Sequence, residues 1–100
     1  MSSLMLNKLD EKQLQIERKI YLENVVECNG ESYYISSLFT NSGYETLVFH
    51  YDRKKGIDDW KPRYIHGYRT RELMEEGHTY ACTHVWECLS YWKDWLEGNI

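Results

Sequence analysis

The chain has 100 residues, a length that supports one hydrophobic core, so we predict a single domain over residues 1–100. Its net charge of −4 argues against a general nucleic-acid binder, because affinity for a phosphate backbone comes mainly from Lys and Arg. Nine Tyr and four Trp exceed the needs of so small a core, and both types favour half-buried positions, which predicts an aromatic interface.

The sequence also indicates where the protein works. No stretch approaches the roughly 20 apolar residues of a membrane-spanning helix, and the first residues lack the long apolar centre of a signal peptide. Three cysteines cannot all pair with one another, so we expect reduced thiols. We therefore predict a protein that stays in the cytoplasm of the cell that makes it and has no contact with a membrane.

The N-terminal segment fits two different periods. Some of its apolar residues recur at helical spacing, and others fit the two-residue period of a strand. The helical set is Leu6, Leu9, Ile16 and Ile20, and the alternating set is Leu14, Ile16, Ile20 and Leu22. We favour a helix over residues 4–19, with Ser2 or Ser3 as its N-cap.

The middle of the chain predicts an antiparallel meander. Residues 21–28, 31–39 and 44–51 are rich in β-branched and aromatic types. The pair Asn29 and Gly30 favours a tight hairpin turn between the first two strands. We expect a loop over residues 52–60 and then a fourth strand that Pro62 opens, at the edge of the sheet, because proline cannot donate to an interior ladder.

The clearest pattern is a long amphipathic helix over residues 70–95. Thr70 is a good N-cap, and Gly98 is a typical C-terminal residue. One broad face of the helix collects Leu73, Met74, Gly77, Ala81, His84, Val85, Cys88, Trp92, Trp95 and Leu96. The predicted fold class is therefore α+β, with a small antiparallel sheet of three or four strands packed by this C-terminal helix.

Two pairs on the predicted helix have metal-ligand spacing. His78 with Cys82, and His84 with Cys88, each stand four residues apart, as in metal-binding helices. The two pairs point about 100° apart on the helix, so one ion cannot easily collect all four. Mid-helix positions also suit a thiol nucleophile poorly. We predict packing roles, no metal, no cofactor and no enzyme activity.

A second flank of the predicted helix suggests a site for a protein partner. Trp86 lies about 140° from the centre of the apolar face. Two interpretations are open: either the N-terminal helix covers Trp86, or Trp86 anchors a protein–protein contact. The residues of this flank are His78, Cys82, Trp86, Leu89 and Lys93.

An alternative function is binding of nucleic acid or a nucleotide. Seven of the twelve basic residues fall between positions 53 and 71, and several sheet tyrosines could stack on bases. The candidate residues are Arg53, Lys54, Lys55, Lys61, Arg63 and Arg69. We favour the simpler interpretation, in which the tyrosines pack against cross-strand neighbours.

Three segments resemble small uncharacterised proteins of phages and prophages of Gram-positive bacteria. They are Tyr-Tyr-Ile-Ser-Ser at 33–37, Tyr-Glu-Thr-Leu-Val-Phe at 44–49 and the stretch at 68–78 that ends in Glu-Gly-His. The resemblance spans about residues 29–85, and this chain has Leu73 or Met74 where those proteins often have alanine. It implies a phage or prophage origin but transfers no chemistry.

Small phage accessory proteins commonly act on host machinery, including defence systems, and the resemblance implies that setting here. Together with the aromatic surplus, it predicts a non-enzymatic protein that binds a host or phage protein and is able to form a homodimer. Within the predicted helix, Gly77 suggests a close approach of helix and sheet, and His78 would then hydrogen-bond a strand.

Overall fold

The computed structural model describes residues 19–57 and 59–98 as an antiparallel sheet and two helices. The elements are β1 (Lys19–Cys28), β2 (Glu31–Thr40), β3 (Gly43–Asp52), β4 (Gly56–Ile57), β5 (Tyr64–Tyr68), α2 (Arg71–Thr83) and α3 (Val85–Leu96). The α+β class is confirmed. The sheet has five strands rather than three or four, because the two-residue β4 forms inside the predicted loop. The helix predicted over residues 4–19 lies outside the described residues, apart from Lys19, which begins β1.

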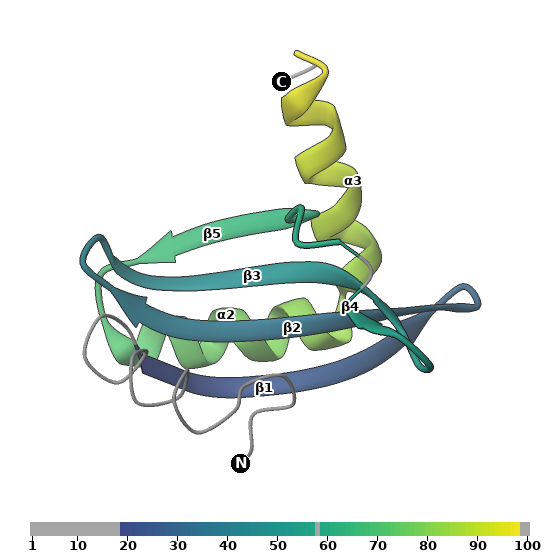
Figure 1. The fold of residues 1–100 in the computed structure, drawn as a ribbon. Helices are drawn as coiled ribbons and strands as arrows, with labels where there is room; N and C mark the ends of the chain where they lie inside the picture. Colours follow the sequence, from purple (N-terminus) through teal and green to yellow (C-terminus); the bar gives the residue numbers. More distant parts are fainter. Residues whose placement is uncertain (1–18, 58, 99–100) are drawn as a thin grey trace.

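The sheet is built on the predicted meander. β1, β2 and β3 pair in sequence order, and both β4 and β5 pair with the outer side of β3 (Figure 1). β4 pairs with the end of β3 at Tyr51, and β5 pairs with the stretch of β3 from Tyr44 to Val48. β5 is thus the edge strand that Pro62 predicted. Asn29 and Gly30 both have positive φ, 54° and 84°, as the expected hairpin turn requires.

α2 lies across one face of the sheet (Figure 1). Its N-cap is Thr70, whose side-chain oxygen accepts a hydrogen bond of 3.1 Å from the Leu73 amide. The hydrophobic core joins strands and helices through Ile35, Val48, Ala81, Val85 and Cys88. None of the described helices is long and apolar enough to cross a bilayer.

The predicted single helix over residues 70–95 is wrong, because the chain breaks at His84. There φ is −133° and ψ is 43°, outside the helical region. The hydroxyl of Thr83 donates to the carbonyls of Thr79 and Tyr80 at 2.9 and 3.3 Å, a back-bonding pattern that bends helices. α3 therefore starts anew at Val85 and projects away from the sheet, as Figure 1 shows.

Because the helix breaks at His84 and α3 projects away from the sheet, only part of the predicted apolar face is buried. Met74, Ala81, Val85 and Cys88 are buried, as expected. The other end of α3 is not covered by the described residues. The face residues that stay exposed are Leu73 at 47%, Trp95 at 51% and Leu96 at 59%. The amphipathic stripe is therefore only partly a core stripe.

The close approach predicted at Gly77 is confirmed. A Cβ built there would lie 2.0 Å from the Tyr68 hydroxyl oxygen and 2.3 Å from Cζ of the same ring. Real side-chain contacts are never so short, so only glycine lets the Tyr68 ring fill the space between β5 and α2. This contact fixes how closely the helix approaches the edge of the sheet.

We expect Gly77→Ala to lower the free energy of unfolding by about 1–3 kcal/mol, the usual cost of overpacking, because the Tyr68 ring must leave its position. Chemical denaturation measures the change. Gly67→Ala is the matched control, since a Cβ there would meet its nearest atom, the Tyr44 carbonyl oxygen, at an ordinary 3.8 Å. An equal loss in both variants would show that the Tyr68 contact is not the cause.

Candidate protein-interaction site

A polar cluster lies between α2 and the sheet. His78 Nδ1 is 2.6 Å from the Ser37 hydroxyl of β2, which is 2.6 Å from the Thr46 hydroxyl of β3. His78 Nε2 is 2.8 Å from Asn24 Oδ1 of β1. Because an amide oxygen only accepts, Nε2 carries the proton, and Nδ1 accepts from Ser37. The cluster ties three strands to the helix.

The geometry of the cluster supports a structural role. Serine beside histidine is the arrangement of many hydrolases, but Ser37 has no exposed surface, so no substrate reaches its hydroxyl. Burial lowers the pKa of His78 to about 4, which keeps the ring neutral at physiological pH. The prediction that His78 lies on a partner-binding flank is wrong, because the side chain is only 4% exposed and lies in the interior. Its predicted hydrogen bond to a strand is confirmed.

Cys82 and Cys88 have no features of reactive thiols. Burial raises the pKa of both the Cys82 and the Cys88 thiols, so both are protonated at neutral pH. Cys82 is half-buried, with its sulfur 3.8 Å from Asn24 Oδ1. Among residues 19–57 and 59–98, no group of three or more His, Cys, Asp or Glu side chains could hold a metal ion.

An exposed aromatic stack forms where α2 meets α3. The rings of Tyr80 and His84 are parallel within 7°, with centroids 4.4 Å apart, and Trp86 lies against His84 at 5.3 Å. The Tyr80 hydroxyl donates to Glu87, which holds the first ring in place. Trp86 is nevertheless 47% exposed and Tyr80 46%. We call these three rings the junction stack.

An open groove of about 480 Å³ lies beside α3. One wall comes from α3 itself, with the apolar side chains Leu89, Trp92 and Leu96 and the charged Lys93. The opposite wall is formed by Tyr33 and by the segment before β5, with Asp59, Lys61, Pro62 and Arg63, and Glu97 also lines the groove. We call it the α3 groove. It brings together Leu89 and Lys93, predicted to bind a protein, and Lys61 and Arg63, predicted to bind nucleic acid.

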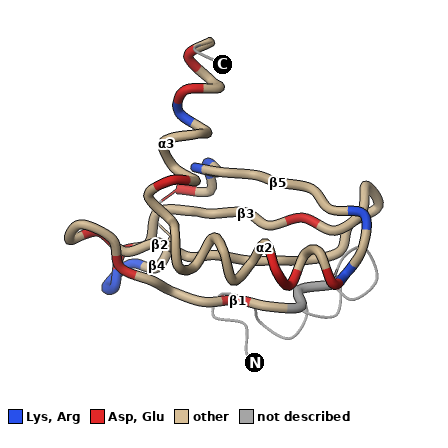
Figure 2. Tube along the Cα trace, turned by 180° about the vertical axis from the view of Figure 1, so that it is seen from behind, with Lys and Arg blue, Asp and Glu red and all other residues tan. Residues whose placement is uncertain are grey.

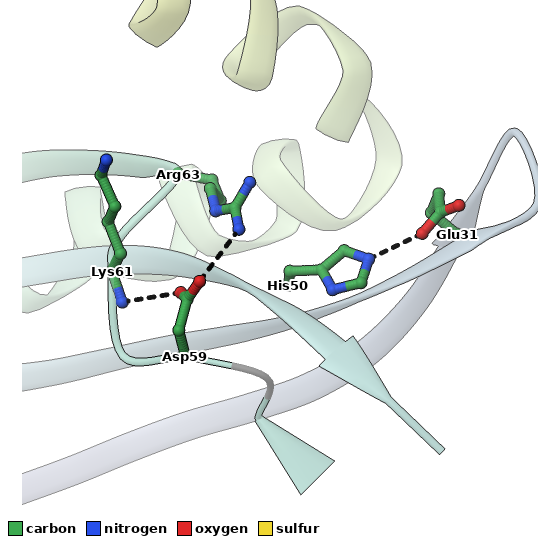
Figure 3. Close-up of polar contacts among 5 residues, drawn as sticks. All are labelled: Glu31, His50, Asp59, Lys61 and Arg63. Carbon is green, nitrogen blue, oxygen red and sulfur yellow. Dashed lines mark hydrogen bonds and ion pairs between the residues drawn. The ribbon is translucent and has the colours of Figure 1, made fainter. Parts of the chain in front are cut away.

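The charges of the groove are incompletely paired. Arg63 Nη2 lies 3.4 Å from Asp59 Oδ2, and the Lys61 side chain points away from the Asp59 carboxylate (Figure 3). Within the described part of the chain, the buried Arg63 Nε has no hydrogen-bond acceptor, and the Lys61 and Lys93 ammonium groups have no ion-pair partner. The pair of His50 and Glu31, at 2.6 Å, lies apart on β3 and β2 (Figure 3).

The basic residues predicted as candidates for nucleic-acid binding do not lie together in the structure. Arg53, Lys54 and Lys55 sit at the turn between β3 and β4, where Arg53 pairs with Glu27 of β1. Lys61 and Arg63 precede β5, and Arg69 follows it, at the other end of the sheet. Figure 2 shows these cations at separate places along the molecule. They therefore do not form one continuous surface, since β5 separates Lys61 and Arg63 from Arg69.

Sequence reasoning missed part of both surfaces. Trp92 and Leu96 were assigned to the core, and Tyr80 was assigned no role. Tyr80 stands four residues before His84, a spacing that places two rings on one side of a helix, so a signal existed. Tyr33 lines the groove because of how the strands pair, and Pro62 lines it because of the course of the loop before β5. No local sequence pattern reveals either position.

Comparison of the chain with protein-family models, with curated proteins and with solved structures finds no match.

Proposed function

We propose that this chain is a non-enzymatic phage or prophage accessory protein that binds a protein partner, and that it acts on host machinery or a host defence system through that binding. The phage setting is supported by the resemblance of residues 29–85 alone. The binding role is supported by the junction stack, and Trp86 is its central residue.

The junction stack has the properties of a binding anchor. A large exposed aromatic ring is costly in water unless a partner covers it, and Trp and Tyr are enriched among the residues that dominate binding energy. His84 and Tyr80 hold Trp86 from one side, so little rotamer freedom is lost on binding. The exposed 47% of its surface is then ready to enter a pocket.

We expect Trp86→Ala to weaken capture of the partner by about 30-fold or more, the effect of losing a hot-spot aromatic residue. The tagged protein is recovered from the cells that produce it, and co-purifying proteins are quantified by mass spectrometry. Trp60→Ala is the matched control, since Trp60 is an equally large ring at 61% exposure on another part of the surface.

The proposal fails if wild type captures no protein above the level of an unrelated bait. It also fails if Trp86→Ala and Trp60→Ala retain every captured protein equally. Recovery of nucleic acid in place of protein, sensitive to Lys61→Ala, would favour the alternative function instead.

A further inference from the structure

We propose that a pocket beside the junction stack binds an arginine side chain of the protein partner. The inference rests on the proposed function, because it names the chemistry of the partner segment that meets this surface. It is supported by the aromatic rings that line the pocket, by a carboxylate that can accept further hydrogen bonds, and by a lining without basic residues.

The pocket lies where β5 meets the junction of the two helices, and its volume is about 510 Å³. Tyr64 and His66 stand two residues apart on a strand, so they share one face of the sheet, and their rings are parallel within 6°. Glu87 and Tyr91 stand four residues apart and share one face of α3. The full lining is Tyr64 and His66 of β5, Tyr80 of α2, and Glu87, Cys88 and Tyr91 of α3. We call it the tyrosine pocket.

The rings of the tyrosine pocket are available to a ligand. Tyr80 is 46% exposed and Tyr91 is 53% exposed. His84 packs on the Tyr80 ring, and the Tyr80 hydroxyl donates to Glu87, so this ring is held in place before any partner arrives. The faces of aromatic rings attract cations, and cages of several rings bind organic cations in many proteins.

Glu87 adds a negative charge to the rings. Among the described residues that line the pocket, Glu87 has the only carboxylate, and none is Lys or Arg. The phenols of Tyr64 and Tyr80 stay protonated, because burial raises the pKa of Tyr64 and the hydrogen bond to Glu87 raises the pKa of Tyr80. The Tyr80 hydroxyl bonds to Oε1 of Glu87, and a carboxylate has about four acceptor positions. The pocket therefore favours a cation that donates hydrogen bonds.

Arginine fits these features better than lysine does. Its planar guanidinium group can stack on a tyrosine ring while its N–H groups reach a neighbouring carboxylate, whereas the lysine ammonium is a compact and strongly hydrated charge. The net charge of −4 on the chain also favours a basic segment in the partner. Because Tyr80 belongs to both the junction stack and the tyrosine pocket, one partner can cover Trp86 and insert an arginine beside it.

Synthetic peptides test the pocket without the natural partner. The probes are acetyl-Gly-Arg-Gly-amide, its lysine counterpart, and its citrulline counterpart, which has nearly the shape of arginine but no charge. Shifts of the protein's amide NMR signals during titration give the dissociation constants. We expect the arginine peptide to bind in the range of about 1–10 mM, at least fivefold more tightly than the citrulline peptide, with the lysine peptide between them.

Two substitutions locate the binding. Glu87→Gln should weaken binding of the arginine peptide about fivefold, because it removes the charge but keeps an oxygen for the Tyr80 hydroxyl. Tyr91→Leu should weaken it about threefold, because it keeps apolar bulk but removes the ring. Both residues are exposed, so both variants should fold. Glu76→Gln is the matched control, since it removes the same charge from an exposed position of α2 outside the pocket.

Equal affinity for the arginine and citrulline peptides would overturn the proposal, as would binding that neither Glu87→Gln nor Tyr91→Leu weakens. Tighter binding of the lysine peptide than of the arginine peptide would overturn the assignment of arginine. If the arginine peptide shows no preference while Trp86 still captures a protein, only the pocket is wrong, and the proposed function stands. If the arginine peptide binds selectively while the chain captures no protein, the proposed function fails, and the preference of the pocket for arginine stands.

Discussion

Acidification from pH 7 to pH 4.5 is expected to lower the free energy of unfolding by roughly 2–3 kcal/mol through His78 alone. Burial holds the pKa of His78 at about 4 in the folded protein, against an ordinary value of 6.5 in the unfolded chain. Between these two values the unfolded state binds a proton that the folded state refuses, so stability falls as the pH falls. The loss begins near pH 6.5 and is complete near pH 4.

The physical cause lies in the polar cluster. Protonation would give His78 a second N–H facing the Ser37 hydroxyl, which would then have to reverse its bond, and it would place a charge at a site that is 4% exposed. Each pKa unit corresponds to about 1.4 kcal/mol, which sets the size of the effect.

Urea denaturation at a series of pH values between 7 and 4.5 measures the loss. His78→Gln keeps a donor and an acceptor but does not titrate, so its stability should fall less over this range, although its value at pH 7 is lower than that of wild type. His66→Gln is the matched control, because His66 is an exposed histidine on β5, outside the polar cluster. A wild-type slope retained by His78→Gln would contradict this account of the cluster.

The second large effect is expected at Met74 in the first turns of α2. Met74 has no exposed surface, so Met74→Ala should leave a cavity between the helix and the sheet and cost about 2–5 kcal/mol. The neighbouring Leu73 is 47% exposed, and Leu73→Ala should cost less than about 1 kcal/mol. The pair is informative because both residues belong to the apolar face predicted from the sequence.

The shift in denaturant midpoint at an unchanged slope gives both values. Equal losses at Met74 and Leu73 would mean that α2 packs on the sheet through a different face from the one described. A small loss at Met74 would mean that the site collapses around the smaller side chain.

Local patterns were enough to predict much of the fold. The β-branched and aromatic residues of the three segments in 21–51, the pair Asn29 and Gly30, and the cap at Thr70 each specify a structure within a few neighbouring residues, and each prediction is confirmed. Gly77 was also interpretable, because a glycine inside a helix suggests a close approach. Its partner, the Tyr68 ring, could be named only from the structure.

The sequence contains only a weak signal for the helix break at His84. No proline or glycine marks it, and Thr83 and His84 have only modestly lower helix propensity than their neighbours. The deciding contacts are the bonds from the Thr83 hydroxyl to two carbonyls and the docking of Val85 and Cys88 in the core. A continuous helix would have kept the stripe on one face, whereas the break turns Trp92 and Leu96 toward the groove.

The candidate surfaces were predictable in kind but not in arrangement. The angle of Trp86 on the helix placed it off the apolar face but left open whether an N-terminal helix covers it, and its side chain is 47% exposed. His78 was misplaced because helical angle alone does not show which strand a residue meets. Lys61 and Arg63 were grouped with Arg53 by sequence position, but pairing of β5 with β3 separates them and brings them to α3.

The central claim is that the junction stack contacts a protein in the cell. Photo-crosslinking from position 86 tests it most directly, with a photoreactive phenylalanine analogue in place of Trp86 and the same substitution at Trp60 as the reference. We predict a discrete crosslinked protein from position 86 that is absent from position 60. Crosslinks of equal pattern and yield from both positions, or none from position 86, would contradict the claim.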